Sequence, residues 1–88
     1  MPSISMFLGI IIRMYFADND RHKTPHMHAV YGEYEGVFTL DGELLAGEFP
    51  AKQAAFVRAW ALMHEDELKA NWTLCLHGEP AFRIDPLR

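Results

Sequence analysis

Two histidines that stand two residues apart, His26 and His28, are the side chains in this sequence best suited to chemistry. On a β-strand, alternate side chains project from one face, so the Cβ atoms of this pair would lie about 7 Å apart. Near neutral pH one imidazole can be neutral while the other is charged, which suits an acid–base pair. The spacing therefore predicts two imidazoles that converge on one metal ion or one substrate atom.

The polar segment that precedes this pair supplies groups that could assist it. The carboxylates of Asp18 and Asp20 could orient an imidazole by accepting its second N–H. The side chains of Arg21 and Lys23 could hold a phosphate of a substrate. His22 could fold back as a third imidazole. Because this segment is rich in turn-forming residues, we expect a loop here.

The sequence leaves three roles open for the histidine pair. In the first, His26 and His28 only tie the loop to the sheet through hydrogen bonds to loop carbonyls and aspartates. In the second they bind a metal, although no later histidine on a second strand completes the ligand set that cupins use after His-x-His and Glu33. In the third they are catalytic residues acting on RNA phosphodiesters. That third role needs neither a metal nor a cofactor, and we assign none.

Short segments with strand composition lie on both sides of the loop. The residues Ile10, Ile12, Met14 and Phe16 are all apolar, which is typical of a strand with one buried face. We expect strands over residues 3–7, 10–16, 26–31, 34–40 and 43–48. Asp41-Gly42 predicts a type I′ hairpin turn, in which both central residues have positive φ. These segments predict an antiparallel meander of four or five strands.

A long amphipathic helix is predicted over residues 51–76, after Pro50 and before Gly78. A straight helix of that length would extend about 39 Å. A globule of this size has a radius of gyration of only about 12 Å, so we expect a bend near His64 or a projecting end. Trp60 should be among the most buried residues. The predicted fold class is α+β, with the bent C-terminal helix packed on one face of the meander.

Composition limits the possible partners and compartments. The 88 residues are half hydrophobic, which predicts one domain with one core over residues 1–88. The formal net charge of −4 gives no general attraction to nucleic acid, which is the less favoured partner. The single Cys75 cannot form an internal disulfide, and Arg13 interrupts the first apolar run. We therefore expect a cytoplasmic protein that does not enter a membrane.

Several motifs occur in an order that resembles a known family. They are Met1-Pro2-Ser3-Ile4, Tyr15-Phe16-Ala17-Asp18-Asn19-Asp20, Thr24-Pro25-His26-Met27-His28, Tyr31-Gly32, the segment from Gly42 to Pro50, and a helix with Trp60, His64, Leu68 and Trp72. Together they resemble the small bacterial proteins of the domain-of-unknown-function 4160 family. That family has no established reaction. Its members are often encoded beside a small protein of the domain-of-unknown-function 2442 family, in an arrangement that resembles toxin–antitoxin pairs.

The resemblance implies one half of a paired, toxin–antitoxin-like module that acts through a protein partner. That partner would be a protein of the domain-of-unknown-function 2442 type or a second copy of this chain. His26 and His28 would form the active or anchoring site, with a phosphodiesterase or RNase activity if the site is catalytic. The alternatives are a non-catalytic binding or structural protein and a small metal-binding protein.

Overall fold

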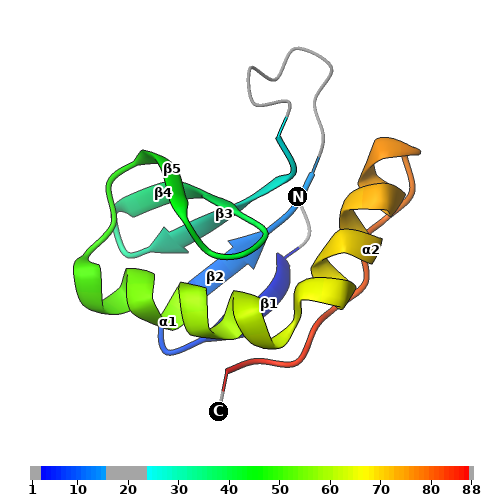
Figure 1. Ribbon diagram of the computed structural model, residues 1–88. Coiled ribbons are helices and arrows are strands. Elements are labelled where there is room, and N and C mark those ends of the chain that lie inside the picture. The colour runs from blue at the N-terminus through cyan, green and yellow to red at the C-terminus, as the bar shows by residue number, and fades with distance from the viewer. Residues whose placement is uncertain (1–2, 16–23, 88) are drawn as a thin grey trace.

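Five strands form one antiparallel sheet in the computed structural model, which describes residues 3–15 and 24–87 (Figure 1). Each strand pairs with the next along the chain, in the order β1-β2-β3-β4-β5. The strands are β1 (Ser3–Phe7), β2 (Ile10–Arg13), β3 (His26–Tyr31), β4 (Tyr34–Thr39) and β5 (Leu44–Gly47). The α+β class and the antiparallel meander are therefore confirmed.

The turn between β1 and β2 contains an unusual backbone conformation. Leu8 has a φ of 50° and Gly9 a φ of 78°, so both central residues have the positive φ that a type I′ turn requires. In this left-handed region the Cβ of Leu8 lies too close to the following carbonyl oxygen, which costs about 1–2 kcal/mol. The leucine side chain is 57% exposed and recovers little of that energy by packing.

We expect Leu8→Asn to raise the free energy of unfolding by about 1 kcal/mol, because asparagine tolerates the left-handed region. For a domain of this size that gain corresponds to a rise of about 4–8 °C in melting temperature, measurable by circular dichroism. Leu45→Asn is the matched control, since Leu45 is 43% exposed and has no positive φ. An equal rise in both variants would contradict the explanation by backbone strain.

The turn between β4 and β5 differs from the prediction. Of its residues only Gly42 has a positive φ, 88°, so the predicted type I′ turn at Asp41-Gly42 is wrong. The loop is instead closed by the Thr39 N–H, which donates to the Glu43 carbonyl at 2.8 Å, and by the Gly42 N–H, which donates to the Thr39 carbonyl at 3.0 Å. A Cβ on Gly42 would lie 2.5 Å from the Cα of Arg58, so this turn packs directly against the helix that contains Arg58.

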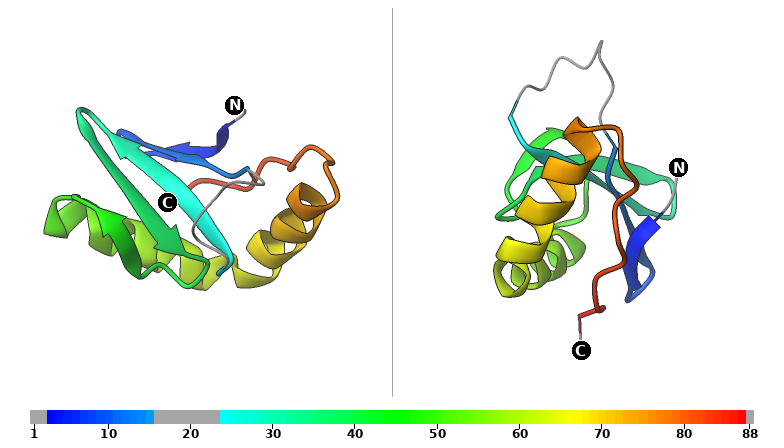
Figure 2. Two further views of the ribbon diagram at one scale, coloured as in Figure 1. Left: turned by 90° about the horizontal axis from the view of Figure 1, so that it is seen from above. Right: turned by 90° about the vertical axis from the view of Figure 1, so that its right-hand side faces the viewer.

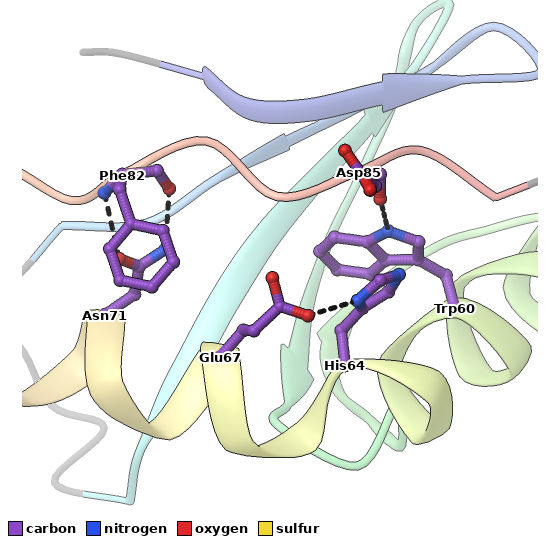
Figure 3. Close-up of polar contacts among 6 residues, drawn as sticks. All are labelled: Trp60, His64, Glu67, Asn71, Phe82 and Asp85. Atoms are coloured by element: carbon purple, nitrogen blue, oxygen red, sulfur yellow. Dashed lines mark hydrogen bonds and ion pairs between the residues drawn. The ribbon is translucent and has the colours of Figure 1, made fainter.

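Two helices follow the sheet where one long bent helix was predicted. They are α1 (Ala51–Met63) and α2 (Glu65–Leu76). His64 separates them with φ −127° and ψ 29°, at the place where the bend was expected. Its Nδ1 lies 2.6 Å from Oε1 of Glu67, which holds the ring against the first turn of α2 (Figure 3). Neither of the helices in the described part of the chain has the length and apolar character needed to cross a membrane.

Both helices lie on one side of the sheet, and the core fills the space between the sheet and the helices (Figure 2). Every second residue of the central strands is buried against them, because side chains alternate between the two faces of a strand. The predicted burial of Trp60 is confirmed, since none of its surface is exposed. The core includes Ile10, Ile12, Met27, Ala29 and Phe38 from the sheet, and Val57, Trp60, Ala61, Leu68 and Trp72 from the helices.

The C-terminal tail runs back between β1 and the helices (Figure 2). The Ile84 N–H donates to the carbonyl of Ile4 at 2.7 Å, so the tail covers the outer edge of β1. The buried side chain of Asn71 bonds both backbone groups of Phe82, at 2.8 and 2.9 Å (Figure 3). Residues 82–84 therefore lie along the sheet without forming a strand themselves.

Candidate functional site

The second face of the sheet carries the candidate site. Pairing aligns Met6, Ile11, Val30 and Glu35 in one row across β1 to β4, and Arg13, His28, Val37 and Ala46 in a second row across β2 to β5. All eight side chains keep some exposure, whereas Ile10, Ile12, Met27 and Ala29, which alternate with them along β2 and β3, are buried in the core. The helix α1 lies on the other side of the sheet (Figure 2), whereas α2 reaches the His26 end of this side, where Trp72 lies 5.1 Å from the ring of His26. We call these eight residues the open face.

The two predicted histidines lie next to each other on β3, which has the predicted bounds. The ring centroids of His26 and His28 are 5.4 Å apart, in an edge-to-face arrangement with an interplanar angle of 69°. Such a distance follows from the strand period, because alternate side chains share a face. The sequence spacing thus brings two imidazoles together at the end of the sheet where the loop enters.

His26 has the surroundings of an anchoring residue. It is fully buried, and its ring centroid lies 5.1 Å from that of Trp72 on α2. Its Nδ1 is 2.9 Å from the carbonyl oxygen of Thr24. A carbonyl can only accept, so Nδ1 carries a proton and donates it in this contact. The imidazole therefore fixes the chain that enters β3 to the core.

His28 has different surroundings and reaches the open face. Its side chain is 13% exposed, and its ring stacks on Tyr15 with centroids 4.6 Å apart and an interplanar angle of 12°. Nδ1 of His28 lies 3.8 Å from a carboxylate oxygen of Glu35 on β4, and Arg13 is its register partner on β2. Both ring nitrogens of His28 are buried, so the imidazole could exchange a proton only with a group that enters between these neighbours.

The three neighbours of His28, which are Tyr15, Arg13 and Glu35, were not assigned to the site from the sequence. Arg13 lies on β2 and Glu35 on β4, and only the strand register places them near His28, whereas Tyr15 follows the end of β2. The available signal was parity, since Arg13 and Tyr15 occupy the mixed alternate positions of an otherwise apolar strand. The Nε atom of Arg13 is buried and has no hydrogen-bond partner among the described residues.

The other predicted site residues belong to the loop before β3. Asp18, Asp20, Arg21, His22 and Lys23 lie outside the described residues. The orienting role of the two aspartates and the substrate-binding role of Arg21 and Lys23 therefore stay predictions.

Comparison with known proteins identifies the family. A domain of unknown function, DUF4160, matches residues 9–73. The chain belongs to this family. The match spans β2 to β5, α1 and most of α2, so the DUF4160 region contains both histidines and most of the open face. No curated protein and no solved structure matches the chain.

A metal-binding role is open to a direct test in this DUF4160 protein. Within residues 3–15 and 24–87 no group of three histidine, cysteine, aspartate or glutamate residues is arranged to hold a metal ion. Two imidazoles alone do not complete the four-ligand set that zinc prefers. We therefore expect calorimetry of the untagged protein at pH 7.5 to detect no stoichiometric binding of Zn²⁺, Ni²⁺ or Cu²⁺. Tight binding that is lost near pH 5, as imidazoles protonate, would establish the metal role.

Proposed function

We propose that this protein is one half of a paired, toxin–antitoxin-like module and that it binds its protein partner through the open face. The observation that supports this proposal is a set of adjacent, partly exposed apolar side chains on the uncovered side of the sheet. Met6 is 55% exposed, and Ile11, Val30 and Val37 are half-buried beside it. Single exposed apolar residues are ordinary on a protein surface, but contiguous ones mark interaction sites.

Burial of these apolar side chains by a partner protein would stabilise the complex. Each buried methylene group contributes about 0.8 kcal/mol, so β-branched side chains in adjacent rows add up to a substantial apolar contact. Arg13 and Glu35 supply charges that fix the orientation of a partner. The resemblance to paired gene products makes a small protein of the domain-of-unknown-function 2442 family the expected partner.

A specific observation supports a second activity, cleavage of RNA phosphodiesters, on the same face. His28 is stacked on Tyr15 and lies across from Arg13. In such a reaction the 2′-oxygen attacks phosphorus while His28 accepts its proton. The bond to the 5′-oxygen breaks, the imidazole returns the proton to that oxygen, and Arg13 holds the phosphate. His28 suits this role better than His26, because its side chain keeps 13% exposure whereas His26 is fully buried and bonded to the Thr24 carbonyl. Both ring nitrogens of His28 are buried, so RNA would have to displace neighbouring groups to reach them.

The two activities are compatible in one module. A partner that covers the open face also covers His28 and would block access of RNA to the imidazole. Binding of one protein would then silence the activity of the other, as a paired toxin and antitoxin require. We place this module in the cytoplasm, where a free cysteine such as Cys75 stays reduced. Desolvation by burial raises the pKa of its thiol, which keeps the group protonated and weakly reactive.

Co-purification tests the partner surface. Met6→Lys places a charge on the open face, whereas the matched control Met63→Lys places the same charge on α1, on the other side of the molecule. Met6 is 55% and Met63 is 63% exposed, so neither change removes a core side chain. We expect Met6→Lys to weaken capture by a tagged, co-expressed protein of the domain-of-unknown-function 2442 type at least about tenfold, a loss of about 1.4 kcal/mol. Capture by Met63→Lys should equal that of the unaltered chain.

Equal capture of both variants would remove the open face as the partner surface. Loss of capture with Met63→Lys alone would move the interface to the helices. The melting temperature of each variant is measured in parallel, so that unfolding is not mistaken for lost binding.

A further inference from the structure

Two opposite charges flank the central strand of the open face. Arg13 on β2 pairs in register with His28, and Glu35 on β4 pairs with Val30. Because β2 and β4 lie on opposite sides of β3, the positive and the negative group are separated by the width of that strand and stand two residues apart along it. The apolar side chains of the face lie around and between them.

Among the described residues, neither charge has a close partner of opposite sign. The Nε atom of Arg13 is buried without a hydrogen-bond partner among residues 3–15 and 24–87, although a buried donor left unpaired is costly. The side chain of Glu35 is 65% exposed, and its ion-pair contact within residues 3–15 and 24–87 is a long one, 3.8 Å, with the imidazole of His28. Arg13 keeps some exposure, so its positive charge can attract an anionic group from outside the chain, and a cation from outside would meet the glutamate.

A second copy of this chain offers both groups at once. A two-fold axis that lies between two stacked open faces and runs along β3 places β2 of each copy over β4 of the other. Arg13 of each copy then lies over the strand that carries Glu35 of its partner, and the apolar rows face each other. Sheets stack face to face about 10 Å apart, a distance that long side chains such as arginine and glutamate bridge together. We propose that two copies of this chain pair through their open faces, with two reciprocal Arg13–Glu35 contacts.

The size of the face sets the expected strength of this dimer. Five strands about 4.8 Å apart and about five residues long give a face of about 24 by 17 Å, or about 400 Å² per copy. Stable interfaces bury about 800 Å² per partner, so the homodimer should be weak, with a dissociation constant in the micromolar range. The inference rests on the proposed role of the open face as a binding surface, and it makes self-pairing a competitor of partner binding.

Sedimentation of the purified full chain from about 1 to about 500 μM tests the dimer and its charge pairs. We expect a reversible monomer–dimer equilibrium for the unaltered protein. Arg13→Glu and Glu35→Arg should each weaken it at least about tenfold, because each sets like charges against each other. The double variant should recover most of the affinity, because it exchanges the two charges. Arg58→Glu is the control, since Arg58 is 52% exposed and pairs at 4.0 Å with Glu43 away from the open face.

Each outcome decides the proposal. A monomer at all concentrations overturns self-pairing, and so does a loss of dimer with Arg58→Glu as large as that with Arg13→Glu. Two weakened single variants without recovery in the double variant overturn the reciprocal contacts. Failure of the dimer is separable from failure of the proposed function: a monomeric protein whose capture by the co-expressed partner still depends on Met6 retains the partner surface and loses only the homodimer.

Discussion

Trp60→Ala is expected to lower the free energy of unfolding by about 3–5 kcal/mol, the range for truncation of a large core side chain. Trp60 is fully buried in α1, and its ring centroid lies 5.3 Å from that of Phe7 on β1. Its indole N–H also donates to the carbonyl of Asp85 at 2.7 Å, so this one side chain joins helix, sheet and tail (Figure 3). Truncation removes the packing and the tail contact together.

Urea unfolding of the full chain, followed by circular dichroism, measures this loss. Phe82→Ala is the control, because Phe82 is 42% exposed and its bonds to Asn71 use only the backbone. We expect the control to lose less than about 1 kcal/mol. A small domain can be unfolded outright by a loss of this size, so Trp60→Phe, which keeps an aromatic ring without the donor, provides an intermediate point. A loss below about 1 kcal/mol for Trp60→Ala would show that α1 does not pack as described.

Sequence pattern was sufficient where local preference and burial agree. The strand β3 begins and ends at the predicted residues, His26 and Tyr31, because alternation of apolar and polar side chains is bounded there by Pro25 and Gly32. The helical region was located by its apolar face. Its division at His64 could only be placed approximately, since a break depends on how both halves meet the sheet.

The turns show where local preference fails. Asp41-Gly42 has the composition of a type I′ turn, yet the positive φ of both central residues occurs at Leu8-Gly9. The turn at Asp41-Gly42 is shaped by its contact with α1, where Gly42 lies against Arg58. The turn at Leu8-Gly9 is set by the tight connection of β1 and β2, and it keeps Leu8 in an unfavourable backbone conformation. Tertiary packing decided both cases, and a single sequence does not contain that information.

The histidine pair could be predicted, but its environment could not. The spacing of His26 and His28 sets the distance between their rings. The contrast between them depends on distant parts of the chain, since Trp72 of α2 buries the first ring and Tyr15 before the loop stacks on the second. Arg13 and Glu35 approach His28 only through the strand register.

His28→Gln is expected to abolish the growth effect of the protein when it is expressed without its partner. Glutamine keeps a polar side chain that can donate a hydrogen bond, but it cannot take up and release a proton near neutral pH. Glutamine is of similar length to the imidazole, so we expect the melting temperature to change by only a few degrees, although both ring nitrogens of His28 are buried. His26→Gln gives the contrast: its imidazole is buried and donates to the Thr24 carbonyl, so that variant should lose about 1–3 kcal/mol.

The central claim is that His28 acts on a ligand at the open face and does not serve only to hold the fold together. The most direct test measures the melting temperature and the growth effect of His28→Gln side by side in the full chain. We predict a nearly unchanged melting temperature together with loss of the growth effect. A fall of about 4–8 °C for each kcal/mol lost, with a growth effect reduced only in proportion to the unfolded fraction, would contradict the claim and assign His28 to the scaffold.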